Sequence, residues 1–269
     1  MEFKEKGNEF FRSNQFEQAI NFYTFGLNSH PDQNLREVLY LNRALSQIKI
    51  LEYDKSLSDC EAVLQFNHSS IKAHYFRGLA LSGKKQYKNA LESLKTSLRL
   101  SEKEKATWIQ ELKGKIDEVE LLLFQENENQ EKNYLEKTKN NLFQYLDELI
   151  RLRNQNSKNV LDIQDKMSEL QIFFEKIQPK RPEIPSYFCC PISLDIMNDP
   201  VVGNSGVSYE KNAIFNYIDS GGNQDPITRI PINKDQFHPN ICLRQAIEEF
   251  LEKNPWAKKR NETIIEQND

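Results

Sequence analysis

The 269-residue sequence has few cysteines and no long apolar run. Its four cysteines are scattered without the paired spacing of a disulfide framework, which is typical of a reducing compartment. No apolar stretch approaches the roughly 20 residues that cross a bilayer, so we expect no membrane association. The first ten residues are too charged for a secretory signal. These absences favour a cytoplasmic protein.

An excess of positive charge is also missing. The chain has 36 basic and 40 acidic residues and a net charge of −4. We therefore expect no nucleic-acid binding. Charged residues make up 28% of the chain, as in proteins with extended helical surfaces. The length allows two or three domains.

An internal repeat occupies residues 1–104. Small or aromatic residues recur at three positions of the repeat: Gly7, Ala44 and Gly78; Ala19, Ser56 and Ala90; and Phe16, Tyr53 and Tyr87. The spacing is 37 and then 34 residues, and Pro31 closes the first unit. The pattern resembles three tetratricopeptide repeats, each a helix–turn–helix. We expect an α-solenoid whose concave groove is lined by the first helix of each repeat.

Residues 105–125 carry an apolar stripe and are expected to form a helix that caps the solenoid. The stripe consists of Trp108, Leu112, Ile116, Val119 and Leu123. Each spacing of three or four keeps these residues on one helix face.

Residues 126–179 contain no glycine and show two heptad stripes. The stripes are Leu135, Thr138, Leu142, Tyr145, Leu149 and Leu152, and then Val160, Ile163, Met167, Leu170, Phe174 and Ile177. Residues 154–157 break the pattern, which predicts a coiled-coil-like hairpin of two helices. A second apolar edge needs a partner of its own: Leu146, Ile150, Leu161 and Phe173. We expect this edge to form a homodimer; the alternative is that it packs on the capping helix of a monomer.

Residues 183–257 combine short strand and helix signals with turn-rich loops. A strand is expected at Pro200–Val202, a helix at Lys211–Ile218 capped by Ser208, and a last helix at Leu243–Leu251. Pro179, Pro182 and Pro185 stiffen the entry to this region, and residues 258–269 are expected to form a flexible tail. The fold class is therefore mainly α with a small α+β domain at the C-terminal end.

Five motifs in this region resemble the U-box of ubiquitin ligases. They are Cys190-Pro191-Ile192-Ser193, Met197-Asn198-Asp199-Pro200-Val201, Gly206-Val207-Ser208-Tyr209, Asp225-Pro226-Ile227-Thr228-Arg229 and Pro239-Asn240. The resemblance implies a RING-like fold held without metal. The cysteines agree, because Cys189, Cys190, Cys242 and His238 contain no C-x2–4-C pair. We expect neither zinc nor any cofactor.

Four polar residues of the repeats stand in register on the predicted first helices: Lys4, Asn8, Asn42 and Lys72. Two ammonium groups and two amides are donors suited to a carboxylate. The set resembles the carboxylate clamp of chaperone-binding tetratricopeptide domains. Phe76 stands where the general clamp has arginine, and Val38, Tyr75 and Phe76 are candidates for an adjoining apolar pocket. The alternative is that both lysines lie on ordinary solvated faces.

The order of parts resembles the CHIP-like family of co-chaperone ubiquitin ligases along nearly the whole chain. The resemblance implies that the repeats hold the C-terminal Glu-Glu-Val-Asp of heat-shock chaperones of the seventy- and ninety-kilodalton classes. It also implies that a ubiquitin-conjugating enzyme docks on Ile192, Leu194 and Pro231. Misfolded clients of the chaperone would be ubiquitinated for degradation, with no covalent nucleophile in the ligase.

Two other functions remain open from the sequence. One is a non-catalytic adaptor whose U-box recruits no conjugating enzyme. The other is a ligase that uses Cys189 or Cys190 as a nucleophile, which would need a nearby base such as His238.

Overall fold

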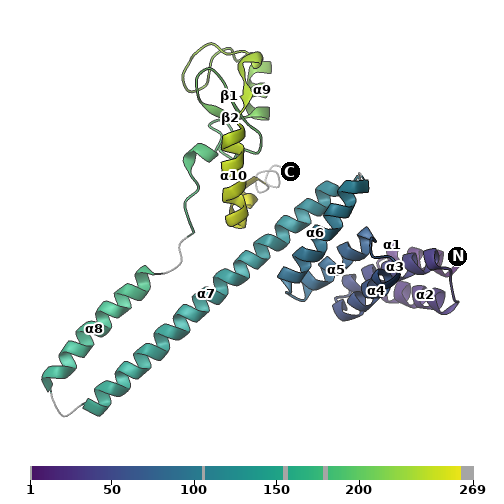
Figure 1. Cartoon of the computed structure of the whole chain (residues 1–269), viewed down its shortest axis with the longest axis horizontal. Helices are drawn as coiled ribbons and strands as arrows, with labels where there is room; N and C mark the ends of the chain where they lie inside the picture. Colours follow the sequence, from purple (N-terminus) through teal and green to yellow (C-terminus); the bar gives the residue numbers. More distant parts are fainter. Residues whose placement is uncertain (1, 105–106, 154–156, 178–180, 262–269) are drawn as a thin grey trace. The chain divides into compact units, whose positions relative to one another are not determined.

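In the computed structural model (Figure 1), the backbone is described for residues 2–104, 107–153, 157–177 and 181–261. Side chains within these ranges are described except at residues 152–164 and 259–261. The chain separates into two compact units, residues 1–123 and 124–269. No helix in the described ranges combines the length and the apolar character that a membrane span requires.

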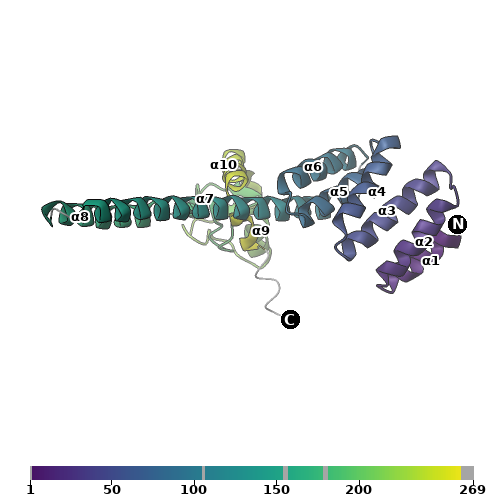
Figure 2. The same cartoon turned by 90° about the horizontal axis from the view of Figure 1, so that it is seen from below.

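The first unit is built from three helix pairs that stack side by side (Figure 2). Their bounds are α1 (Glu2–Arg12), α2 (Phe16–Asn28), α3 (Gln33–Lys49), α4 (Tyr53–Phe66), α5 (Ile71–Gly83) and α6 (Tyr87–Glu104). The small residues that define the repeat are fully or nearly fully buried between the helices. The solenoid expected from the sequence is therefore confirmed.

The backbone repeats as well as the side chains. The residue two places before α2, α4 and α6 adopts a positive φ in each case: Asn14 (58°), Leu51 (64°) and Lys85 (60°). These three residues keep the repeat spacing of 37 and 34. A left-handed residue here turns the chain sharply enough for the two helices of a repeat to lie antiparallel. Leu51 is exposed because it occupies this turn.

Helix α7 (Ile109–Arg153) starts as the cap of the solenoid. Leu112, Ile116 and Val119 are buried and pack in one cluster with Leu91 and Leu94 of α6. The helix then continues without a break, whereas the sequence predicted separate helices on either side of residue 126. Residues 126–134 contain neither glycine nor proline to end a helix, so one helix of 45 residues forms.

Helix α8 (Ser157–Lys176) runs beside the later part of α7 (Figure 1), and Phe174 lines a cavity there with Leu135 and Lys139. Tyr145 and Leu149, predicted to face α8, are exposed instead. Leu146 and Ile150, predicted to form the outer edge, are half-buried. A straight uninterrupted helix drifts by about 20° per heptad against a 3.5-residue repeat, which rotates the stripe.

The other residues predicted for the hairpin and its exit complete the comparison. Phe173 is exposed, as the prediction of an outer edge requires. Three parts of the prediction lie outside what the structure describes: the side chain of Leu161, the residue Pro179, and residues 154–156 of the predicted turn.

The C-terminal part of the second unit is a small sheet with helices around one core. Its elements are η1 (Ser186–Phe188), β1 (Pro200–Val202), β2 (Ser208–Glu210), α9 (Lys211–Asp219), η2 (Lys234–Gln236), β3 (His238–Pro239), α10 (Ile241–Lys253) and η3 (Pro255–Asn261). The sheet is antiparallel with the order β2-β1-β3. Met197, Val201, Tyr209, Ile214 and Ile247 are almost fully buried in its core.

Two predicted helix ends differ from the structure. Ser208 lies in β2 and caps nothing; α9 follows Glu210, whose side chain makes no capping hydrogen bond. Helix α10 begins two residues earlier than predicted because the Asn240 Oδ1 accepts the Leu243 N–H at 3.1 Å. Helix η3 extends to Asn261, into the predicted tail, and residues 262–269 lie outside the described chain.

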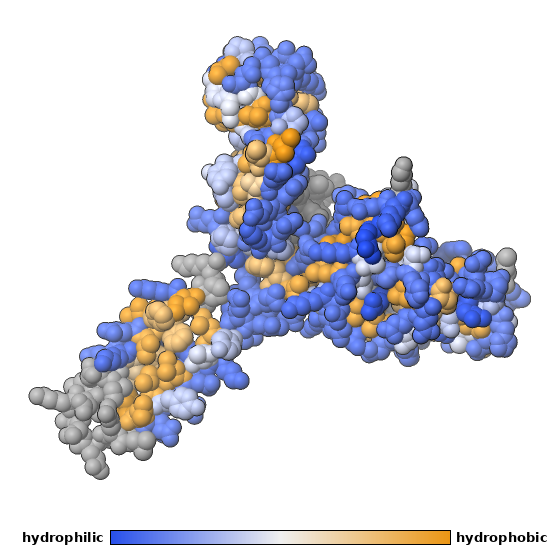
Figure 3. Space-filling model, in the orientation of Figure 1, coloured by the Kyte–Doolittle hydropathy of each residue, from blue (hydrophilic) through white to orange (hydrophobic). Residues whose placement is uncertain are grey.

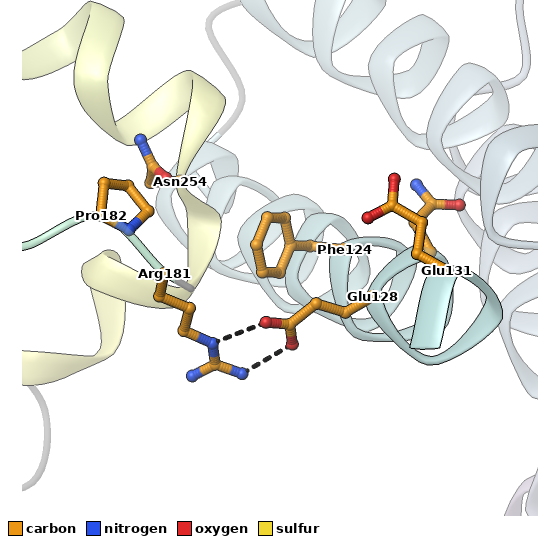
Figure 4. A pocket seen from close by; sticks show the side chains of 7 residues that line it. Phe124, Glu128, Glu131, Arg181, Pro182 and Asn254 are labelled. Carbon is orange, nitrogen blue, oxygen red and sulfur yellow. Dashed lines mark hydrogen bonds and ion pairs between the residues drawn. The ribbon is translucent and has the colours of Figure 1, made fainter. Parts of the chain in front are cut away.

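Arg181 connects this region with α7 inside the second unit (Figure 4). Its Nε and Nη2 donate to the two carboxylate oxygens of Glu128 at 3.0 and 2.9 Å. The guanidinium carbon also lies 5.6 Å from the centre of the Trp256 ring. The hydrogen bonds from Arg181 lower the pKa of Glu128. One side chain thus joins the long helix to the last turn of the domain.

Candidate functional sites

Helices α1, α3 and α5 each present a pair of the singled-out residues four positions apart. The pairs are Lys4 and Asn8, Val38 and Asn42, and Lys72 and Phe76. Residues four apart share a helix face, so each first helix of a repeat contributes two neighbouring side chains to one side of the solenoid.

The structure brings the two asparagines into direct contact. The Asn42 Nδ2 donates to the Asn8 Oδ1 at 3.0 Å, and the Tyr23 hydroxyl donates to the same oxygen at 2.9 Å. With Phe11 and Leu45, these three residues line a small cavity of about 70 Å³. The Asn8 oxygen is occupied by two donors, which leaves its amide nitrogen available for an acceptor.

The two lysines differ in their surroundings. The Lys4 ammonium lies 3.1 Å from the Glu5 carboxylate, and the side chain is largely covered. Lys72 is exposed on α5, and no ion pair engages it within the described part of the chain. An unpaired, exposed ammonium on a first helix of the solenoid is a site for an anionic group.

The three apolar candidates are divided between different clusters. Val38 is 40% exposed on α3. Phe76 packs against the cluster of Leu41, Val63 and Ala73 while remaining partly accessible. Tyr75 contacts the Trp108 ring edge-on at 5.4 Å and belongs to the capping cluster. Val38 is therefore the most open of the three, while Phe76 and Tyr75 are both partly buried.

Two loops of the C-terminal domain, L1 (residues 189–196) and L2 (residues 224–231), fold in the same way. An isolated β-bridge pairs the first and last residue of each loop. The sixth residue of each has a positive φ of 63°, Leu194 in L1 and Arg229 in L2. Its N–H donates to the carbonyl oxygen four residues earlier, at 2.8 Å in L1 and 2.9 Å in L2. The domain thus displays one loop architecture twice.

The second residue of each loop folds its side chain back onto the loop backbone. The Cys190 Sγ accepts the Ile192 N–H at 3.4 Å, and the Asp225 Oδ1 accepts the Ile227 N–H at 2.9 Å. Both side chains are fully buried. Thiol and carboxylate therefore hold their loops by hydrogen bonds.

Asp225 is the main polar anchor of L2. Its carboxylate accepts the Ser205 hydroxyl at 2.6 Å and the Tyr209 hydroxyl at 2.8 Å, besides the Ile227 N–H and the Thr228 N–H at 2.8 Å. Burial by itself raises the pKa of Asp225, but the hydrogen bonds outweigh it and lower the value to about 2. The group is thus a fixed anion that ties L2 to β2.

A second polar anchor fixes the segment that follows L1. The Glu210 carboxylate accepts the N–H groups of Asn198 and Asp199 at 2.7 and 3.1 Å. The Asp199 carboxylate in turn pairs with Arg244 of α10 and lies 3.7 Å from the Lys211 ammonium. Among the residues that the structure describes, no group of three or more His, Cys, Asp or Glu side chains is arranged to hold a metal ion.

L1 and L2 both carry exposed apolar side chains. The sequence indicated Ile192 and Leu194 of L1 and Pro231 of L2, and all three are exposed. It missed Ile227 and Ile230, which are 58% and 45% exposed. The missed signal was the repeated pattern Pro-Ile-Ser/Thr, which places Ile227 in L2 where Ile192 stands in L1.

Cys189 and Cys190 are the cysteines that the sequence offered as alternative nucleophiles. Cys190 is buried and Cys189 packs against the domain core. His238 is exposed in β3 and makes no hydrogen bond with either thiol within the described residues. His238 therefore does not supply the base that either thiol would need for activation.

The polar anchors, the two loops and the small sheet define a RING-like domain of the kind found in U-box ubiquitin ligases. Residues 184–256 match the U-box domain family. The chain is 33% identical over 268 residues to the E3 ubiquitin-protein ligase CHIP of Arabidopsis thaliana, covering 95% of this chain and 94% of that protein. It belongs to the CHIP family of ubiquitin-protein ligases.

Two further similarities each concern one part of the chain. The E3 ubiquitin-protein ligase PUB22 of Arabidopsis thaliana is 42% identical over 73 residues, which are 27% of this chain and 17% of that protein. The first tetratricopeptide domain of Spaghetti (RPAP3), solved with the HSP90 peptide SRMEEVD, is 27% identical and covers 45% of this chain and 90% of that chain, with a TM-score of 0.40.

Proposed function

We propose that this ligase is a chaperone-associated ubiquitin-protein ligase. Its repeats bind the C-terminal Glu-Glu-Val-Asp of heat-shock chaperones of the seventy- and ninety-kilodalton classes, and its U-box recruits a ubiquitin-conjugating enzyme that modifies misfolded clients for degradation. The observation that supports this proposal most directly is the contact between Asn8 and Asn42, on first helices of the repeats, in a chain that also contains a U-box. A cytoplasmic location is part of the proposal.

The groove offers donors for a terminal carboxylate. The Asn8 amide nitrogen is free of the contacts that occupy its oxygen, and the Asn42 amide nitrogen has a second hydrogen to give. Lys4 and Lys72 add charge-assisted hydrogen bonds, which are stronger than neutral ones. The valine of the peptide would lie against Val38 and Phe76, both partly open to solvent.

The U-box contributes position and not a nucleophile. A conjugating enzyme that carries ubiquitin as a thioester would dock on Ile192, Leu194 and Pro231. Ile227 would extend this apolar surface in L2. The client lysine, delivered by the chaperone on the repeats, then attacks the thioester carbonyl; the thioester bond breaks and the conjugating enzyme's cysteine leaves as thiol. Holding both reactants on one scaffold supplies effective concentration.

The hairpin of α7 and α8 is proposed to form a homodimer. Tyr145, Leu149, Ile172 and Phe173 are each more than half exposed, and Figure 3 shows an orange apolar patch over this part of the molecule. Each such side chain that stays in water forgoes about 1.5–3 kcal/mol of hydrophobic stabilisation. Pairing two hairpins about a twofold axis would bury the same patch on both chains.

The deciding experiment has two arms. Calorimetry compares a peptide ending in Glu-Glu-Val-Asp with a free carboxylate and the same peptide amidated; we expect the amidated form to bind much more weakly. A reaction with activating enzyme, conjugating enzyme, ubiquitin and ATP should modify a chaperone-bound client. Equal binding of both peptides contradicts the clamp, and peptide binding without transfer makes the chain an adaptor.

A further inference from the structure

Tyr23, on the second helix of the first repeat, has a polar contact that its packing position does not require. Its ring lies against Gly7, where a Cβ would come within 2.4 Å of the Tyr23 Cε1. In the third repeat Leu94 packs in the same way against Gly78, where a Cβ would come within 2.6 Å of the Leu94 Cγ. An aliphatic side chain therefore satisfies this packing position, and a hydroxyl is not needed for it.

The second repeat supports the same conclusion. The residue in this register is Cys60, which is fully buried like Leu94. Tyr23 is thus the member of the set that brings a hydroxyl to the groove side, at 2.9 Å from the Asn8 Oδ1. Burial raises the pKa of Tyr23 to about 12, so the hydroxyl keeps its proton and can donate at neutral pH.

Resting on the proposed binding of a C-terminal carboxylate, we propose that Tyr23 is a positioning residue that sets the orientation of the Asn8 amide. The Tyr23 hydroxyl and the Asn42 Nδ2 both donate to the Asn8 Oδ1, at 2.9 and 3.0 Å. An amide whose oxygen faces two donors must direct its nitrogen elsewhere. The Asn8 Nδ2 is then the atom that can donate to a carboxylate.

The contact also determines what the groove rejects. An Asn8 amide that is free to rotate presents its oxygen as easily as its nitrogen, and an oxygen repels a carboxylate but tolerates an amide. By donating to the Asn8 Oδ1 together with the Asn42 Nδ2, the Tyr23 hydroxyl holds the amide with its oxygen turned toward the two donors. Discrimination between a free and an amidated C-terminus is therefore the property that depends on Tyr23, while the apolar contacts of the peptide do not.

The test is a double-mutant cycle read by calorimetry on the full-length protein. The probe is an acetylated octapeptide ending in Glu-Glu-Val-Asp, with a free carboxylate or amidated. Tyr23→Phe should weaken binding of the free-acid peptide about fivefold, the effect of losing one neutral hydrogen bond, and should leave the amidated peptide unchanged. In an Asn8→Ala background, Tyr23→Phe should change free-acid affinity less than about twofold.

The control is Tyr87→Phe, which alters a partly buried tyrosine of the capping cluster, away from the Asn8 amide, and should affect neither peptide. Loss of affinity in Tyr23→Phe that persists fully in the Asn8→Ala background would assign Tyr23 to packing and overturn the inference. Unchanged free-acid binding by Tyr23→Phe would overturn it as well. If the wild-type protein binds both peptides equally, the failure belongs to the proposed function.

Discussion

Lys72 is the side chain on which the carboxylate proposal depends most directly, because its exposed ammonium has no ion pair within the described residues. Lys72→Ala should weaken binding of the free-acid peptide about tenfold or more, since a hydrogen bond to a charged group contributes about 1.5–3 kcal/mol. Calorimetry measures the change, and Lys88→Ala on α6 is the matched control. Equal affinities of the two variants would remove Lys72 from the site.

Ile192 tests the docking surface at the same scale. Because its side chain is exposed in L1, Ile192→Ala should abolish ubiquitin transfer while thermal unfolding and peptide binding stay unchanged. Ile227→Ala, the equivalent change in L2, should reduce transfer in the same direction. An autoubiquitination assay checks both, with the exposed Leu51→Ala as control. A variant that unfolds at a lower temperature would make Ile192 a structural residue.

Asp225 should make the folding stability of the U-box depend on pH in the acid range. Its pKa of about 2 in the folded state lies below the ordinary value of about 3.9, so its contribution to stability is present above pH ~4 and is lost as the pH falls toward 2. Asp225→Asn cannot accept all four hydrogen bonds and should destabilise the domain by about 3 kcal/mol or more at pH 7. The difference from wild type should shrink between pH ~4 and ~2.

The measurement uses the two tryptophans of the chain. In a Trp108→Phe background, the fluorescence of Trp256 reports urea unfolding of the C-terminal domain alone. Asp235→Asn, which alters an exposed carboxylate of η2, should leave stability within about 0.5 kcal/mol of wild type. Equal stability of the Asp225 and Asp235 variants at pH 7 would show that the buried carboxylate does not anchor L2.

Among the elements, the hairpin of α7 and α8 makes the prediction that concerns assembly. Light scattering should give twice the chain mass of 31.6 kDa at micromolar concentration. Tyr145→Asp with Leu149→Asp should weaken the dimer, since both residues are exposed on α7 and would place two charges in an apolar interface. Peptide binding by the repeats should persist.

Leu51→Asp alters an exposed leucine of the first unit and should leave the mass doubled. A wild-type mass near 31.6 kDa would show that the hairpin does not pair. A double variant that remains fully dimeric would place the interface outside Tyr145 and Leu149, for example in the U-box.

For the whole molecule, the proposed peptide site and the U-box are located in separate units. Lys72→Ala should therefore leave autoubiquitination unchanged, and Ile192→Ala should leave peptide affinity unchanged. Modification of a chaperone-bound client needs both functions on one scaffold, so each variant alone should abolish it. The assay compares client and autoubiquitination in one reaction; loss of autoubiquitination in Lys72→Ala would contradict the separation.

The sequence by itself determined the features that depend on local repetition. Gly7, Ala44 and Gly78 recur because small residues let the two helices of a repeat approach closely, and this spacing predicted the solenoid. The motifs around Cys190 and Asp225 predicted the U-box in the same manner. Asn8 and Asn42 could be named as groove residues because the repeat register places both on first helices.

Only the tertiary structure decided what depends on contacts between distant residues. The buried face of α7 differs from the predicted one, because one continuous helix carries its apolar stripe past the boundary that the sequence predicted. Tyr145 is therefore exposed and Leu146 half-buried. The contact of Tyr23 with Asn8 joins two helices and is not encoded in any spacing. The four donors to Asp225 come from three separate segments, and their geometry exists only after the loops have folded around it.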